Sequence, residues 1–404
     1  MQTPIRHARA LAGGAVFLLA SVVGAQEWPN WRGPNHDGIS AEKDLKTTLP
    51  EPLKPIWERE IGSAFSSFTC VEGKVYTCGT QDKRQVLFCL DADTGDVIWQ
   101  TPFEEEYPEG SGGDGTRATP TVNEGRVYIP GPLGTLLCCD AQTGKEIWKK
   151  RFKHKPQWGY AGSVLIEGDL AIVSVGKANG ALLALNKETG KTVWKCGNDQ
   201  AGYATPYPFT FEGKRYIVGF TGKSVIIAEA ETGREVWRMP WKTEWDVNAS
   251  SPIYHDGHLF LSSGYKHGCI LLRLGLEGDS LIAEPVYPVS DVLRSKFQSC
   301  VLHEGHLYGC DEEELNCVEF LTLEQKWSVG RGRMKHGSVV LANGYLYVLS
   351  ERGELQIAKA TPDGFEPLSK GRILSGRCWT VPTLYRGRLY ARNLEKAVCI
   401  DLRD

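Results

Sequence analysis

The stretch CDAQTGKEIW, at residues 139–148, decides the fold of this 404-residue chain. Its Asp-x-x-Thr-Gly core is a turn signal between two apolar runs. Glycine adopts the positive φ that a tight hairpin needs, and aspartate accepts hydrogen bonds from the backbone of the turn. The signal recurs at residues 91–95, 186–190 and 229–233, each time with a tryptophan four positions after the glycine. A repeat with a period in the forties is typical of four-stranded propeller blades.

The composition agrees with an all-β protein. Glycine is plentiful, at 45 residues, and no long stretch shows the 3.6-residue apolar period of a helix. The formal net charge is only −3, so no basic surface points to nucleic acid or to an anionic membrane. We therefore expect a globular β protein that does not bind nucleic acid.

A second signature counts the blades. A polar or acidic residue followed by glycine and an apolar or aromatic run marks the first hairpin of each unit. It occurs at Gly73, Gly125, Gly168, Gly213, Gly257, Gly305, Gly344 and Gly387. Eight such hairpins predict an eight-bladed β-propeller of four-stranded antiparallel blades.

The ring is predicted to close through an N-terminal strand. The last unit ends without an outer strand, whereas residues 55–59 form an orphan strand that contains a tryptophan. This strand is expected to complete the last blade, so that the propeller covers residues 55–404 and leaves no open sheet edge. The outer-strand tryptophans should pack between neighbouring blades: Trp57, Trp99, Trp148, Trp194, Trp237 and Trp327.

Two segments precede the propeller. Residues 1–25 have a basic start, an apolar stretch and small residues at a cleavage site, which predicts a signal peptide; an uncleaved membrane anchor is the alternative. The mature protein is then periplasmic or secreted, without a transmembrane segment. Residues 26–54 are a lead-in whose proline and glycine density excludes regular strand or helix. Its Trp28 and Trp31 should pack against the propeller, or else be exposed to a partner.

The positions of the twelve cysteines favour a packing role over a reactive or metal-binding role of their thiols. Cys89, Cys138, Cys317 and Cys399 occupy equivalent strand positions, where another repeat has Ala184, so a cysteine there is a small apolar filler. The chain has no Cys-x-x-Cys pair, which leaves c-type haem and a zinc ribbon unsupported. Two other features are candidate metal-binding motifs. One is a pair of His-x-Gly-His hairpins, and the other is the acidic turn at residues 91–96. The former positions vary among repeats and the latter lacks EF-hand spacing, so no metal site is predicted.

The repeats at residues 89–99, 138–148, 184–194 and 227–237 resemble the tryptophan-docking repeats of PQQ-like (quinoprotein alcohol dehydrogenase-like) β-propellers. The resemblance covers the chain from about residue 50 onward. It implies a propeller fold in a superfamily that includes quinone-dependent dehydrogenases and a non-catalytic lipoprotein of outer-membrane β-barrel assembly.

The resemblance leaves the activity open. A dehydrogenase needs a quinone pocket, calcium and a catalytic aspartate, and in such enzymes adjacent cysteines form a ring over the cofactor. Cys138 and Cys139 instead lie inside a strand, where alternation sends one thiol to each face. We therefore expect an exported, non-catalytic binding or scaffolding propeller without a cofactor. A PQQ- and calcium-dependent dehydrogenase is the alternative. An assembly factor is a further alternative, disfavoured because no cysteine follows the expected cleavage site.

A candidate site emerges when the repeats are aligned on their hairpin glycines. Small residues fill the inner strands, as expected where eight strands crowd a channel. Preceding them is a column that is mostly aromatic, and its candidate ligand-binding members are Arg117, Tyr160, Tyr203, Phe297, His336 and Trp379. This column predicts a ring at one channel mouth that binds a small planar or anionic ligand, with Arg117 engaging an anionic or carbonyl group. Alternatively, the large side chains plug the channel. A protein partner is also open, and a monomer is expected.

Overall fold

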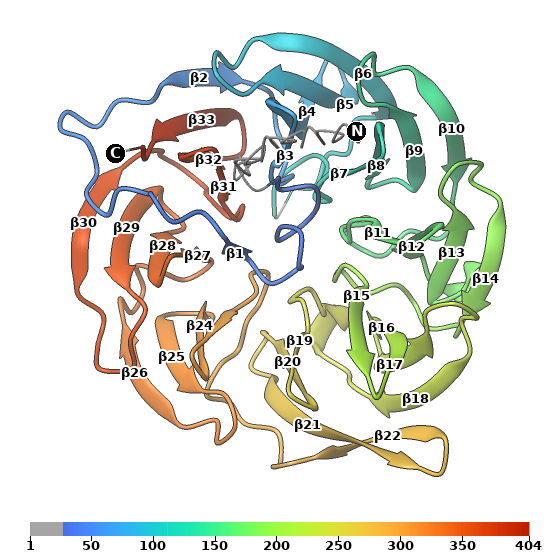
Figure 1. Ribbon diagram of the computed structural model, residues 1–404. Coiled ribbons are helices and arrows are strands. Elements are labelled where there is room, and N and C mark those ends of the chain that lie inside the picture. Colours follow the sequence, from blue (N-terminus) through green and yellow to red (C-terminus); the bar gives the residue numbers. More distant parts are fainter. Residues whose placement is uncertain (1–26, 111, 404) are drawn as a thin grey trace, which may run out of the picture.

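The computed structural model describes residues 27–110 and 112–403, so the predicted signal peptide at residues 1–25 lies outside the described part. Eight sheets stand like petals around a central axis (Figure 1). Each sheet runs from a short inner strand to an outer strand, and each pairs antiparallel within its blade. The eight-bladed propeller predicted from the hairpin glycines is therefore confirmed.

The first four blades follow the chain in order. Blade 1 has β3 (Thr69–Val71), β4 (Lys74–Gln81), β5 (Arg84–Asp91) and β6 (Val97–Glu105). Blade 2 has β7 (Thr121–Asn123), β8 (Arg126–Pro130), β9 (Thr135–Asp140) and β10 (Glu146–Arg151). Blade 3 has β11 (Leu165–Glu167), β12 (Leu170–Ser174), β13 (Leu182–Asn186) and β14 (Thr192–Cys196). Blade 4 has β15 (Tyr207–Phe211), β16 (Lys214–Phe220), β17 (Ser224–Glu229) and β18 (Glu235–Pro240).

The remaining blades complete the ring. Blade 5 has β19 (Ile253–His255), β20 (His258–Ser263), β21 (Gly268–Glu277) and β22 (Ser280–Pro285). Blade 6 has β23 (Val301–His303), β24 (His306–Cys310), β25 (Leu315–Glu319) and β26 (Gln325–Val329). Blade 7 has β27 (Ser338–Ala342), β28 (Tyr345–Leu349), β29 (Glu354–Lys359) and β30 (Pro367–Arg372). Blade 8 has β31 (Thr383–Tyr385), β32 (Arg388–Arg392), β33 (Lys396–Asp401) and β2 (Trp57–Glu60). Two short 3₁₀ turns, η1 (Lys177–Asn179) and η2 (Glu244–Asp246), lie in loops.

The repeated turn and the repeated tryptophan form one interlock between blades. The indole of Trp99 in blade 1 lies against Gly144 in the Thr-Gly turn of blade 2, so close that an added Cβ would stand 2.5 Å from the ring. Its Nε1 donates a hydrogen bond to Ala141 O at 3.1 Å. Gly144 also has φ +69°, a backbone angle that residues other than glycine rarely adopt. The equivalent indole-to-carbonyl bonds join Trp57 to Ala92, Trp148 to Lys187, Trp194 to Ala230 and Trp327 to Thr361.

The cysteines in the third strands fill the space beneath these indoles. Cys138 in β9 lies between Tyr128 of β8 and Trp148 of β10 in the register of blade 2. The two rings around it stand with centroids 6.0 Å apart. Burial raises the pKa of the Cys138 thiol to about 12, so the thiol is protonated and unreactive near neutral pH. Cys139 points to the other face of the sheet, into the core between blades 1 and 2.

The interlock predicts unequal losses among the tryptophans. Trp194 is 7% exposed and hydrogen-bonded, so Trp194→Ala should lower the free energy of unfolding by about 3–4 kcal/mol. Trp237 is half-buried, and among the described residues no hydrogen bond of its indole is found. Trp237→Ala should cost only about 1–2 kcal/mol. Urea unfolding of both variants measures the difference, and equal losses would contradict the interlock.

The inner strands are joined by a belt of hydroxyl groups. Ser67 N donates to Thr119 Oγ1 at 3.0 Å, and Thr119 N donates to Ser163 Oγ at 2.9 Å. Ser163 N in turn donates to Thr205 Oγ1 at 2.9 Å, and Ser251 N donates to Ser299 Oγ at 2.7 Å. The small residues near the axis therefore do more than fit a crowded channel. Their hydroxyls accept the amide hydrogens that short inner strands leave unpaired between blades.

The ring closes as predicted. Strand β2 pairs antiparallel with β33, and Trp57 lies opposite Cys399. Next to this seam, Arg392 of β32 is fully buried, and its hydrogen-bond partners are backbone carbonyls and one hydroxyl rather than carboxylates. It donates to Gly62 O at 2.9 Å and to Cys78 O at 2.5 Å in or beside blade 1, and to Leu394 O at 2.9 Å in blade 8.

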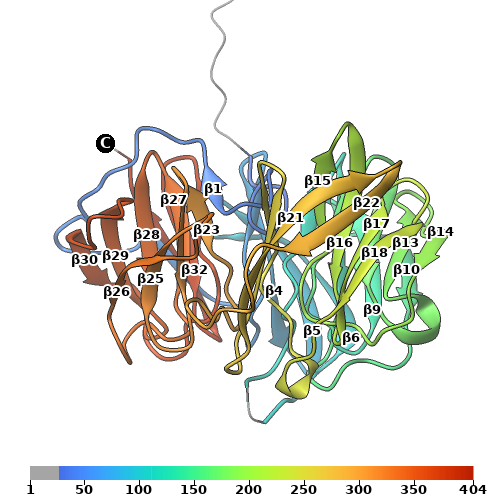
Figure 2. The ribbon, with the colours of Figure 1, turned by 90° about the horizontal axis from the view of Figure 1, so that it is seen from below.

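The lead-in seals one end of the axis. Figure 2 shows it in blue along one face, opposite the face that carries the yellow turn η2. Trp28 is buried and pairs with Cys70 of blade 1, so it packs against the propeller as predicted, whereas Trp31 is half-buried and bonds to Ser251. Further contacts reach five other blades, through Val122, Ser251, Cys300, Tyr347 and Leu402.

One local expectation for the lead-in was wrong. Residues Ile39–Ser40 form a short strand, β1, which pairs parallel with β27 and gives blade 7 a fifth strand. The proline and glycine density around it excluded a long strand, but two residues are enough to pair with the inner edge of a blade. Leu341 N also donates to Gly38 O, which extends this attachment by one bond.

Candidate functional site

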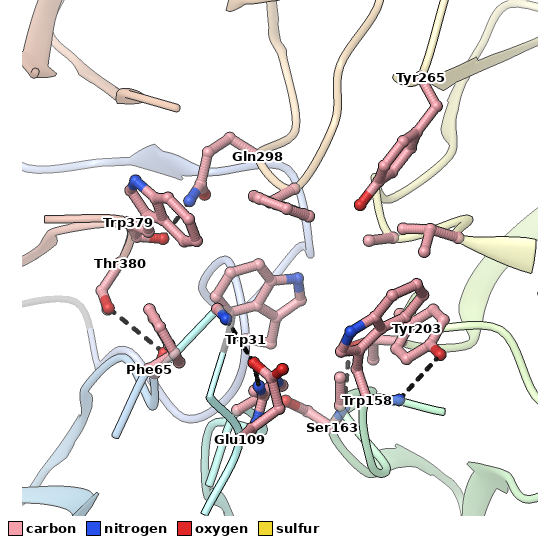
Figure 3. A pocket seen from close by; sticks show the side chains of 17 residues that line it. Trp31, Phe65, Glu109, Trp158, Ser163, Tyr203, Tyr265, Gln298, Trp379 and Thr380 are labelled. Atoms are coloured by element: carbon pink, nitrogen blue, oxygen red, sulfur yellow. Dashed lines mark hydrogen bonds and ion pairs between the residues drawn. The ribbon is translucent and has the colours of Figure 1, made fainter. Parts of the chain in front are cut away.

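A cavity of about 270 Å³ lies on the propeller axis. Trp31 of the lead-in stands at its centre in Figure 3, anchored by a 3.2 Å hydrogen bond from its Nε1 to Ser251 Oγ. The walls come from loops at the face of the propeller opposite the lead-in. Trp31 of the lead-in closes the other end of the cavity and forms its floor. The channel is neither an open pore nor a solid plug.

The predicted column supplies much of this wall. Four of its six candidate residues line the cavity, namely Arg117, Tyr203, Phe297 and Trp379. Phe65, the equivalent residue of blade 1, lines it as well and stacks on Trp379 with centroids 5.8 Å apart. Phe297 adds a third ring, 5.3 Å from Trp379. The column thus comes together as an aromatic wall, while ligand binding there stays a prediction.

Two candidates do not reach the cavity. Tyr160 turns into the core, where its ring contacts Phe152 and its hydroxyl bonds to Lys153 O and Val175 O. Gly159, which precedes it, has φ +75°. His336 lies behind the wall, with its ring 4.7 Å from Trp379 and 5.1 Å from Phe297.

His336 is held in one orientation. Its Nδ1 bonds to Glu351 Oε2 at 2.8 Å, and Trp379 Nε1 donates to the same oxygen at 3.2 Å. Burial lowers the pKa of His336 below its ordinary value, although the bond to Glu351 acts in the opposite direction. Glu351 thereby fixes the indole of Trp379 against the cavity.

Arg117 is the one member of the predicted column with a permanent charge at the cavity, and that charge is compensated. Its Nη2 lies 3.4 Å from Glu109 Oε2, and the two side chains are 15% and 11% exposed. The guanidinium also donates to Gly113 O and Gly115 O and lies between the rings of Phe65 and Tyr107. Burial lowers the pKa of Arg117, and Tyr107 and Glu109 oppose this shift. The expected contact with an anionic ligand group stays a prediction.

Sequence reasoning missed several lining residues: Trp31, Glu109, Trp158, Tyr265 and Gln298. Trp31 was predicted to pack against the propeller or to be exposed to a partner, but not to line a cavity. Trp158 stands two positions before the predicted column. Tyr265 comes from the loop between β20 and β21, which lies outside the aligned column. Its pKa is raised to about 12 by burial.

The residues do not fit a calcium-bound quinone well. Cys138 and Cys139 point to opposite faces of β9 and cannot form a ring over a cofactor. Calcium takes six to eight oxygen ligands, several of them carboxylates, whereas the cavity wall offers one carboxylate, Glu109, already paired with Arg117. Among residues 27–110 and 112–403, no three His, Cys, Asp or Glu side chains gather to hold a metal.

Comparison with known proteins places the fold and its repeats. The family model described as "Outer membrane protein assembly factor BamB" matches residues 82–276. The outer membrane protein assembly factor BamB of Burkholderia pseudomallei (strain K96243) is 25% identical over 217 residues, 50% of this chain. The match spans about half of that relative, 51% of its length.

Solved structures support the same fold. BamB from Moraxella catarrhalis is similar with a TM-score of 0.58 and 16% identity, covering 85% of this chain and 98% of that one. A europium-containing methanol dehydrogenase is similar with a TM-score of 0.65 and 12% identity, covering 90% and 89%. In the described part of the chain, helices long and apolar enough to cross a bilayer are absent.

Proposed function

We propose that this chain, a member of the PQQ-like β-propeller family, is a periplasmic or secreted binding protein that holds a small ligand in its axial cavity without transforming it. The observation that carries this proposal is the blind aromatic cavity built by four predicted column residues and floored by Trp31. Cavities that bind small molecules are concave, mostly apolar and equipped with a few polar groups. This one has that composition, with Gln298, Ser163, Thr205 and the Arg117–Glu109 pair as its polar groups.

Ligand binding can be tested by tryptophan fluorescence, because Trp31, Trp158 and Trp379 line the cavity. A panel of monosaccharides and planar aromatic carboxylates, including pyrroloquinoline quinone with Ca²⁺, is titrated into the full chain. A binder should shift the emission, and Trp379→Ala should weaken its affinity at least about tenfold, or 1.4 kcal/mol.

Trp237→Ala is the matched control, because it removes a half-buried indole from the outer strand of blade 4, far from the cavity lining. If it weakens binding as much as Trp379→Ala, the ligand is not in the cavity. Dye reduction with alcohols after addition of the quinone and Ca²⁺ would replace the proposal with the dehydrogenase alternative.

The match to BamB favours a second candidate, a scaffold in outer-membrane protein assembly. Its support is a family model that covers residues 82–276, independent of the cavity. Deletion of the gene should then lower outer-membrane protein levels, and re-expression of Trp379→Ala should restore them fully. Failure of the cavity variant to restore them would tie the phenotype to ligand binding instead.

A further inference from the structure

We propose that the cavity and its mouth bind an acidic sugar, a uronic acid unit within a short oligosaccharide. This inference rests on the proposed function and names the ligand class of the same site. Three features carry it: cations at the mouth that no carboxylate pairs among the described residues, a buried acceptor without a partner, and an exposed tryptophan that continues the aromatic wall outward.

The mouth carries cations held on aromatic rings. Lys296 Nζ lies 4.4 Å from the ring centre of Tyr265, and Arg377 Cζ lies 4.5 Å from that of Trp379. Both rings line the cavity. Within the described residues neither cation has an ion pair with a carboxylate. Arg377 Nη1 also donates to Gly112 O, a neutral acceptor, and the Glu312 carboxylate near Tyr265 accepts the backbone amides of Tyr265 and Lys266. Ring and carbonyl contacts do not neutralise the two cations, so both are available to an anionic group.

One hydrogen-bond acceptor in the interior has no partner among the described residues. Gln298 is 4% exposed, and its Nε2 donates to Trp379 O, which fixes the amide. Its Oε1 is buried and has no partner among the described residues. A buried acceptor without a partner costs about 1–3 kcal/mol, and a ligand hydroxyl would remove that cost. Ser163 and Thr205 each accept an amide hydrogen, which leaves their own hydroxyl hydrogens to donate to ligand oxygens.

The aromatic wall continues beyond the cavity. Trp245 in η2 is 55% exposed and has φ +67°, an outlier for so bulky a residue. Its ring lies edge-on to Trp158, with centroids 6.2 Å apart, and Trp158 lines the cavity. Backbone strain of this kind concentrates at binding sites. An exposed indole beside a lining indole gives a second stacking platform for a ligand longer than one ring.

An acidic sugar satisfies all three features together. Its carboxylate pairs with Lys296 or Arg377, its hydroxyls reach Gln298, and its successive rings lie along the aromatic wall and then on Trp158 and Trp245. A planar aromatic acid has few hydroxyl donors for Gln298, and it leaves Trp245 without a role. A neutral sugar leaves the two cations unpaired.

The test titrates digalacturonate, galacturonate, maltose and an aromatic dicarboxylate, naphthalene-2,6-dicarboxylate, into the full chain. We expect digalacturonate to bind at least about tenfold more tightly than maltose, with an affinity that falls as salt rises. Lys296→Ala/Arg377→Ala should abolish that preference. The control Lys145→Ala/Lys191→Ala removes two exposed cations of the Thr-Gly turns, and should leave the preference unchanged. Trp245→Ala should weaken digalacturonate but not galacturonate.

The outcomes separate the two proposals. If naphthalene-2,6-dicarboxylate binds, Trp379→Ala abolishes that binding and digalacturonate does not bind, the small-ligand cavity stands and the acidic sugar is wrong. Equal binding of maltose and digalacturonate overturns the role of the cations. If none of the four probes changes the fluorescence, and neither does the broader panel, both proposals fail.

Discussion

A chain that starts at residue 62 is expected to lose its cooperative unfolding transition and to aggregate. Such a chain lacks β2, so the outer edge of blade 8 presents the unpaired backbone of β33. It also loses Trp57, whose indole lies against Gly95 and bonds to Ala92 O in blade 1. An open edge of this kind pairs with other chains. Calorimetry and light scattering at rising protein concentration measure both effects.

A chain that starts at residue 55 is the matched control, because it also lacks the lead-in but keeps β2. It should melt cooperatively, at a lower temperature than the chain that starts at residue 27, since the lead-in contacts of Trp28 and Leu45 are gone. If the two shortened chains behave alike, closure by β2 is not what holds the ring.

Arg392→Leu is expected to lower the free energy of unfolding by about 5 kcal/mol. The side chain is fully buried and donates to carbonyls on both sides of the seam between blades 8 and 1. Leucine relieves the cost of burying a charge, but it takes the donor from the Gly62 and Cys78 carbonyls, at about 1–3 kcal/mol each, whereas Leu394 O keeps a hydrogen bond from Ala64 N. Those acceptors belong to the backbone and cannot be removed, so the loss outweighs the gain. Guanidinium chloride unfolding measures the change.

The free energy of unfolding of Arg392→Lys should lie between those of the unchanged chain and of Arg392→Leu. An ammonium has three donors, but it lacks the planar fork that lets the guanidinium reach both blades. Arg372→Leu, on the exposed outer strand β30, is the control and should change stability by less than about 0.5 kcal/mol. A loss below about 1 kcal/mol for Arg392→Leu would mean that water replaces the guanidinium at the seam.

The repeat architecture was predictable because it rests on local chemistry. A glycine that needs positive φ and an indole that needs a glycine to lie on leave a spaced pattern in the sequence, as Gly144 and Trp99 do. Closure was predictable for the same reason. Trp57 is the tryptophan typical of an outer strand, but it precedes the first complete blade in the sequence. These features depend on residues close to a turn or on one missing strand.

The cavity was harder to predict, because it depends on how segments meet at the axis. The alignment placed Trp379 and Phe297 correctly, yet it could not show that Tyr160 turns into the core after Gly159 or that His336 lies behind the wall. Trp31 comes from a segment outside the repeat, and no period relates it to the column. The Arg117–Glu109 pair also depends on a loop whose path the repeat does not fix.

The lead-in also sets an order of events during synthesis. Its contacts include Leu402 of blade 8 as well as Cys70 of blade 1. The lead-in is synthesised before the blades, so its contacts with blade 8 can form only after that blade has been made. Trp57 likewise pairs with Cys399, 342 positions further along the chain. Contacts so distant in sequence form slowly, and until they do the first and last blades keep open edges. The lead-in contacts that close one end of the axis therefore form late. Until they form, the exposed strand edges can aggregate, and chaperones that cover such edges are needed most.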